Sequence, residues 1–438
     1  MFEVKKELLD SHEALLEVTF EEPAVDEAKR RAAAKISREV NIPGFRKGKA
    51  PYAKVLQYVG EGSVVQEAAE LLVDEAYTQI LEKGEVSPYG PGEYVSMQPS
   101  PLVLKIRVPL EPSVELGDYL SIRESWEDPA VSDEEVTQVL EQMREEHAIM
   151  EHVDRPAAMG DQVLVDVKAV ANGDVLVDEK EIEVVLSESR PFLSPEFVAA
   201  LVGMSVDEEK QTTLVLPETI DQPSLQGVEA DFTLTVRHVH ERTLPNLDDA
   251  LASTVGSFET VAELEKDVRE RLMAHKQEQA EGEYQTKLVS KLVEQSTVAY
   301  PPVLLDETLD EIVNETKQRV ETQRKMSLED ALRLDGLTLE QFRDQMRPQA
   351  EIRVKRSLAL SKLAEQEGVA VSDDEVAQEY MNLLSRIGMV EQLTDRTVDV
   401  DSALGRNLRS NVLGRKVMSR LTAIGRGEAQ VAEAEAGA

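Results

Sequence analysis

Residues 41–51 of this 438-residue chain read NIPGFRKGKAP, and this stretch separates two segments that are predicted to be helical. A Pro-Gly pair lies near its start and Gly48 follows four positions after the first glycine, so we expect tight backbone turns here. The preceding segment, 26–40, and the following segment, 64–83, have the periodicity of helices. The sequence therefore predicts two helices joined by a glycine-punctuated loop.

Charge sets this region apart from the rest of the chain. The whole chain has 85 acidic and 48 basic residues, a formal net charge of -37. Residues 26–54 reverse that sign, because nine basic residues stand against three acidic ones, a net charge of +6. An acidic chain repels nucleic acid as a whole, so any contact with RNA must come from a local basic patch of this kind.

The residues alone leave two interpretations of the loop open. Arg46 and Lys47 can neutralise phosphates, while Phe45 can stack on a base or enter an apolar crevice. The alternative is a solvated basic helix followed by a turn, with Phe45 packed back into the core. The composition of the loop does not choose between them.

The pattern along the chain predicts a multidomain α+β protein. Residues 1–115 are predicted to form an α+β domain, with strands near 14–20 and 102–110, where apolar residues alternate. Residues 116–154 are predicted to be a linker that contains a helix. The composition changes again after this linker.

Residues 155–243 have a β pattern with one short helix at 195–201, and are predicted to form a β-rich domain. Residues 244–424 are predicted to form an elongated all-α domain with arms, because long helical segments combine with an aromatic content of only 4%. Pro348 should kink its helix or end it. Residues 425–438 are polar and are predicted to be a disordered tail. Capping boxes predict helix starts at Ser132–Glu135, Thr260–Glu263, Thr338–Gln341 and Ser372–Glu375.

Several chemistries are not expected. The chain has no cysteine, and its six histidines include only one pair at a metal-binding spacing, His238 and His240. This pair lies at strand period, and an exposed strand face explains it, so no metal site is predicted. No nucleotide-binding loop is present and no cofactor is expected. No stretch approaches the roughly 20 apolar residues of a membrane helix, and a cytoplasmic location is expected.

The loop resembles the ribosome-docking signature of bacterial trigger factors, Gly-Phe-Arg-x-Gly-x-x-Pro. The matching residues are Gly44, Phe45, Arg46, Lys47, Gly48, Lys49, Ala50 and Pro51. The order of the predicted parts is also similar to that family over essentially the whole chain. The resemblance implies docking of residues 1–115 on the large ribosomal subunit, at protein and rRNA beside the exit tunnel. It also implies nascent and unfolded polypeptides as clients, no need for a nucleotide, and a possible homodimer off the ribosome.

By position, residues 155–243 resemble the FKBP-type prolyl isomerase domain of the same family. The family resemblance implies Phe197, Ile220 and Phe232 as the pocket residues. Isomerisation of an X–Pro bond needs a dry aromatic pocket rather than an acid–base pair. Ile220 stands where the family has a tyrosine, so we expect the fold to persist and peptidyl-prolyl cis-trans isomerase activity to be weak.

Three functions follow from these observations. The first is an ATP-independent chaperone that docks at the ribosomal exit tunnel and shields nascent chains. The second is a cytosolic prolyl isomerase and holdase that acts mainly off the ribosome. The third is an interaction scaffold whose basic loop binds another acidic partner. They differ in what they require of Phe45, Arg46 and Lys47.

Overall fold

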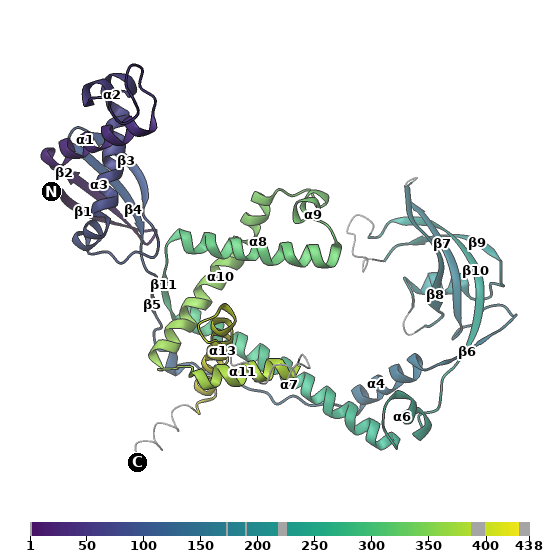
Figure 1. Cartoon of the computed structure of the whole chain (residues 1–438). Coiled ribbons are helices and arrows are strands. Elements are labelled where there is room, and N and C mark those ends of the chain that lie inside the picture. The colour runs from purple at the N-terminus through teal and green to yellow at the C-terminus, as the bar shows by residue number, and fades with distance from the viewer. Residues whose placement is uncertain (1, 172–173, 189–190, 218–225, 387–398, 429–438) are drawn as a thin grey trace, which may run out of the picture. The chain divides into compact units, whose positions relative to one another are not determined.

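The computed structural model describes residues 2–171, 174–188, 191–217, 226–386 and 399–428. The chain divides into two compact units, and Figure 1 labels helices and strands of each. One unit is Met1–Trp126 together with Glu281–Ala438, and the other is Glu127–Ala280.

The N-terminal part of the first unit is a four-stranded antiparallel sheet packed against helices. Its strand order is β1-β2-β4-β3. The strands are β1 (Phe2–Leu9), β2 (Glu13–Phe20), β3 (Glu93–Pro99) and β4 (Leu102–Pro109). Every second residue of β2 from Ala14 to Phe20 is buried, which is the period of a strand with one face on the core. The strands predicted near 14–20 and 102–110 are confirmed, whereas β1 and β3 were not predicted.

Three helices belong to this domain. They are α1 (Glu22–Glu39), α2 (Tyr52–Val59) and α3 (Glu61–Gly84). The helices predicted at 26–40 and 64–83 are confirmed as α1 and α3, each with an earlier start. Helix α2 was not predicted, because its eight residues are fewer than the about 11–18 over which helical periodicity is read.

The rest of the first unit is helical apart from one short strand pair. Strand β5 (Ser113–Glu115) pairs antiparallel with β11 (Thr297–Ala299). The other elements are η1 (Tyr119–Ser121), the end of α7 (Val261–Gln295), α8 (Pro302–Arg324), α9 (Leu328–Leu334), α10 (Leu339–Gln366), α11 (Asp373–Arg386) and α13 (Ala403–Arg426). Leu288 of α7, Leu421 of α13 and Leu116 share one core. The start of the segment predicted as a linker is therefore packed among these helices.

Three of the four predicted capping boxes form both of their bonds. Reciprocal side-chain and backbone bonds form at Ser132–Glu135, Thr338–Gln341 and Ser372–Glu375. Helix α10 continues through Pro348, so the alternative in which the proline ends the helix is wrong. Helix α13 reaches Arg426, two residues into the segment predicted as a disordered tail, and residues 429–438 of that tail lie outside the described residues.

The second unit contains a five-stranded antiparallel sheet. The strand order is β6-β10-β7-β8, and β9 pairs with β10 on the same edge as β6. The strands are β6 (Ile149–His152), β7 (Gln162–Ala171), β8 (Asp174–Val185), β9 (Glu209–Val215) and β10 (Glu229–Thr243). The predicted helix at 195–201 is confirmed as α5 (Pro195–Leu201). Helices α4 (Asp133–Glu146), α6 (Asp249–Val255) and the first part of α7 complete the unit.

Within the described residues, no helix is long and apolar enough to cross a membrane.

Candidate functional site

The loop after α1 has a defined backbone. The amide of Gly48 donates to the carbonyl of Ser37 at 2.7 Å, and the amide of Phe45 donates to the carbonyl of Ile42 at 3.1 Å. Gly44 and Gly48 have φ angles of 86° and 76°, a region that glycine adopts without steric cost. The turns around the two glycines thus fold the loop back onto the end of α1.

One apolar residue anchors the loop. Ile42 is 6% exposed and packs in a cluster with Ala33 and Ile36 of α1 and Val55 of α2. Burial of a whole isoleucine side chain contributes about 1.5–3 kcal/mol. The cluster therefore fixes the start of the loop, and Ala50 packs against it near the other end, while the residues between them are exposed.

The tip of the loop is exposed. Phe45 is 37% exposed, and Arg46, Lys47 and Lys49 are exposed as well. The interpretation that packs Phe45 into the core does not describe this structure. An aromatic ring followed by two cations is available to a partner, and arginine is among the residues that contribute most binding energy in many interfaces.

The basic residues divide into two groups. Arg31 and Lys35 of α1 form ion pairs with Glu75 and Glu67 of α3, and they hold the two helices together. The bond from Arg31 lowers the pKa of the Glu75 carboxyl below its ordinary value. In the described part of the chain, no ion pair involves Arg38, Arg46, Lys47, Lys49 or Lys54. Among the residues that the structure describes, the cations of the loop are thus without a carboxylate partner, as are Lys29 and Arg30 of α1.

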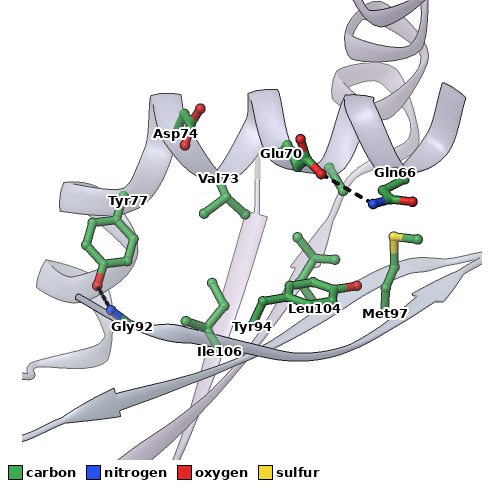
Figure 2. A pocket seen from close by; sticks show the side chains of 11 residues that line it. Gln66, Glu70, Val73, Asp74, Tyr77, Gly92, Tyr94, Met97, Leu104 and Ile106 are labelled. Atoms are coloured by element: carbon green, nitrogen blue, oxygen red, sulfur yellow. Dashed lines mark hydrogen bonds between the residues drawn. The ribbon is translucent and has the colours of Figure 1, made fainter. Parts of the chain in front are cut away.

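A groove lies elsewhere in the same domain, between α3 and the strands β3 and β4 (Figure 2). Its volume is about 540 Å³. Val73 of α3 faces Ile106 of β4 across it, and Tyr94 is 54% exposed at its edge. The Tyr77 hydroxyl accepts a hydrogen bond from the Gly92 amide at 2.8 Å and closes one end. The groove is an apolar surface that a side chain from outside could enter.

The groove also has an acidic side. Glu70 and Asp74 line it from α3, and Gln66 donates to Glu70 at 3.4 Å. Partial burial, with a smaller contribution from the charge of Glu70, raises the pKa of Tyr94 above its ordinary value. This combination suits an apolar group that carries a cation nearby.

The residues that the isomerase resemblance implies lie in the β-rich domain. Phe197 is fully buried and Phe232 is 3% exposed, and their ring centroids are 5.8 Å apart. Ile220 lies outside the described residues. Phe192, in the loop before α5, is 42% exposed and its ring centroid lies 5.6 Å from that of Phe197. The structure thus joins two of the three residues within the core, and their catalytic role stays a prediction.

Comparison with known proteins gives two family matches. Residues 2–143 match the family described as bacterial trigger factor protein, and residues 260–423 match the bacterial trigger factor protein C-terminus. A trigger factor of Dehalococcoides mccartyi strain BAV1 is 32% identical over 381 residues, which cover 87% of this chain and 85% of the relative. The chain belongs to the trigger factor family.

Further relatives agree with this assignment. A trigger factor of Moorella thermoacetica is 32% identical over 85% of this chain and 84% of the relative. A solved structure from work on promiscuous substrate recognition by the trigger factor chaperone has a TM-score of 0.53 and 25% sequence identity, and covers 96% of this chain and 98% of its own. Trigger factors are ribosome-associated chaperones, and this member binds ribosomes and unfolded chains.

Proposed function

We propose that residues 44–51 dock this trigger factor on the large ribosomal subunit beside the peptide exit tunnel. The exposed tip of Phe45, Arg46 and Lys47 carries the proposal, because it joins an aromatic ring to two cations that lack ion pairs among the described residues. The cations neutralise rRNA phosphates, and the ring enters an apolar crevice of a ribosomal protein or stacks on a base.

Docking orients the chaperone toward emerging chains, which it shields without a nucleotide. Gly44, Gly48, Lys49 and Pro51 complete the docking residues, the glycines through the backbone turns that present the tip. We also propose that the chain is divided into domains and linkers with the bounds 1–115, 116–154, 155–243, 244–424 and 425–438. The same proposal includes a cytoplasmic location, and self-association of the free protein into a homodimer.

The groove of Figure 2 supports a role in client binding. Its apolar floor and the carboxylates of Glu70 and Asp74 suit an unfolded segment with an apolar side chain next to a lysine or arginine. The groove and the docking loop are separate surfaces of one domain. Under this proposal the domain therefore docks through the loop and binds the client through the groove.

We assign at most weak prolyl isomerase activity to the β-rich domain. Phe197 and Phe232 serve as core residues there, and a ring buried in the core does not present a face to a substrate. Nothing in the described residues favours isomerase action off the ribosome over the docked chaperone.

The docking proposal is tested by co-sedimentation with ribosomes. Replacement of Phe45, Arg46 and Lys47 with alanine removes the ring and two phosphate contacts, and should weaken binding by roughly a thousandfold. A matched control is the double variant Arg324→Ala/Lys325→Ala, which removes an exposed Arg-Lys pair at the end of α8. Ribosome binding by the triple variant at the level of the control would refute the proposal.

Salt provides an independent check of the same contact. Three phosphate contacts, from Arg46, Lys47 and Lys49, predict a fall of roughly thirtyfold in the binding constant between about 50 and 200 mM salt. An affinity that does not change with salt would show that the cations do not meet phosphates.

A further inference from the structure

Three of the six histidines of the chain meet on one surface of the β-rich domain. The ring centroids of His152 and His240 are 5.6 Å apart, those of His152 and His238 are 5.7 Å apart, and those of His238 and His240 are 6.2 Å apart. The sequence spacing reveals only the second and third of these residues. His152 joins them from a strand that lies more than eighty positions earlier in the chain.

The backbone explains why the three rings share a face. In β10 the even positions Phe232, Leu234 and Val236 are buried, and a bulge after Val236 then changes the phase, so that Val239 is buried instead. His238 and His240 therefore both point to the outer face.

His152 of β6 is the direct cross-strand partner of His240. Directly opposed residues of an antiparallel pair lie on the same face, and their Cβ atoms are about 4.5–5.5 Å apart. The arrangement is thus set by strand register and by a bulge, not by chance contacts of flexible side chains.

The separations between the three imidazole rings can be compared with those around a zinc ion. Imidazole nitrogens bind zinc at about 2.0–2.1 Å, so the ring centroids of three ligands around one tetrahedral ion lie roughly 5–6 Å apart. The observed separations are close to that range. In the described residues no group of three or more His, Cys, Asp or Glu is already arranged to hold a metal ion. His238 is exposed, so rotation about its side-chain bonds can turn a ring nitrogen toward the other two rings.

We propose that His152, His238 and His240 form a binding site for a divalent transition-metal ion of the zinc type. Asp154 assists the first ligand, because its Oδ1 lies 3.3 Å from Nε2 of His152. A carboxylate in this position orients a metal-binding imidazole, which then binds the ion through its other nitrogen. Three neutral imidazoles suit zinc, nickel or copper, whereas magnesium and calcium prefer oxygen ligands.

The ion would join two strands that connect the sheet to the helices of its own unit. Strand β6 follows α4, and β10 leads to α6. Only four residue pairs link β6 to β10, and they run from Ile149–Thr243 to His152–His240. A metal bridge at the last of these pairs adds a cross-link to a short ladder, so binding should stabilise the fold against unfolding.

The test is a titration of the untagged full-length chain with ZnCl2 alone, followed by calorimetry and by the visible absorption of Co2+ as a substitute ion. We expect one strong site per chain above the weak binding of the many carboxylates, and Co2+ bands typical of nitrogen ligands. His152→Ala and His240→Ala should each weaken the strong site at least about tenfold, because even loss of a group that only orients a ligand has an effect of that size.

The control is His275→Ala, which removes an exposed histidine of α7. It should bind zinc as the wild type does. Thermal unfolding without metal shows whether each variant is folded. Zinc should raise the melting temperature of the wild type and of His275→Ala, but not that of the variants that lack a proposed ligand. Equal zinc binding by the wild type and by the triple variant of His152, His238 and His240 would overturn the proposal, as would the absence of a strong site in the wild type.

Discussion

Phe45 and Phe197 are two phenylalanines from two motifs, and their surroundings are opposite. Phe45 lies at the tip of a loop with its ring 37% exposed, while Phe197 is fully buried in the β-rich domain. The difference begins in the backbone. The loop is bonded to the end of α1 and anchored by Ile42, so its tip is kept out of the core. Helix α5 instead directs Phe197 onto the sheet, against Phe232.

This comparison shows that the same residue type can serve recognition or stability. A ring that is held outside the core by ordered backbone is available to a partner without a folding transition. A ring in the core contributes to stability through the area it buries. Four experiments test this division, and they follow in order of the expected effect.

The largest effect is expected from Phe197→Ala. Removal of a buried phenyl ring leaves a cavity and should lower the free energy of unfolding of the β-rich domain by about 3–5 kcal/mol. Urea denaturation followed by far-UV circular dichroism measures it. The control Phe192→Ala removes an exposed ring of the same domain and should cost less than about 1 kcal/mol. Equal losses in the two variants would contradict the assignment of Phe197 to stability.

The next effect concerns binding rather than folding. Phe45→Ala should reduce ribosome affinity by about 2 kcal/mol, which is roughly thirtyfold, without a change in melting temperature. Fluorescence titration of labelled protein with ribosomes gives the affinity. Phe192→Ala again serves as the control, because its ring is as exposed as that of Phe45 but belongs to the other unit. A large change in stability on loss of Phe45 would place its ring in the core after all.

A smaller effect is expected from Gly44→Ala. The φ of 86° at this position costs an alanine about 1–2 kcal/mol, so the loop should rearrange and lose several-fold in ribosome affinity. Gly62 of α3 is the matched control, because it is helical and an added Cβ meets nothing within 4 Å. Gly62→Ala should leave docking unchanged and stabilise the helix slightly. Unchanged docking by Gly44→Ala would show that the turn does not position the tip.

The smallest effect is expected on the acid unfolding of the β-rich domain. The Glu181 amide donates to Asp166 at 2.9 Å, and Arg237 bonds the same carboxylate, so its pKa lies below the ordinary 3.8. A lowered carboxyl pKa contributes stability above the unfolded value, and this contribution is lost as pH falls below 3.8 through the folded value. Asp166→Asn should therefore flatten the acid limb of unfolding of the β-rich domain slightly, whereas the exposed control Asp178→Asn should not. Parallel acid limbs for wild type and Asp166→Asn would contradict this.

Local sequence signals were enough for several elements. Helix α5 begins at Pro195, where Ser194 caps it, and its bounds agree with the prediction. The reciprocal cap of Ser132 and Glu135 also forms as its spacing predicts. In each case the interacting groups lie within one turn, so the sequence contains the whole interaction. Local signals do not decide every helix end. Helix α10 continues through Pro348, although proline is disfavoured in the interior of a helix.

The docking loop could be predicted from the sequence only in part. Its charge, its glycines and its place between two helices are properties of the sequence. Exposure of Phe45 is not, because it depends on Ile42 meeting Val55 of a helix that local periodicity did not predict. The groove beside Tyr94 could not be predicted either, since α3 and β3 form it together.

The sequence by itself determined the membership in the trigger factor family, the basic loop and the local caps, because each depends on residues close together in the chain. Only the tertiary structure decided which aromatic rings are exposed and which histidines meet. His152 reaches His240 because two strands pair in one register, and a bulge of one residue sets the face of His238. Such contacts arise from long-range pairing, whose register is set by burial of one face of the whole sheet rather than by neighbours in the sequence.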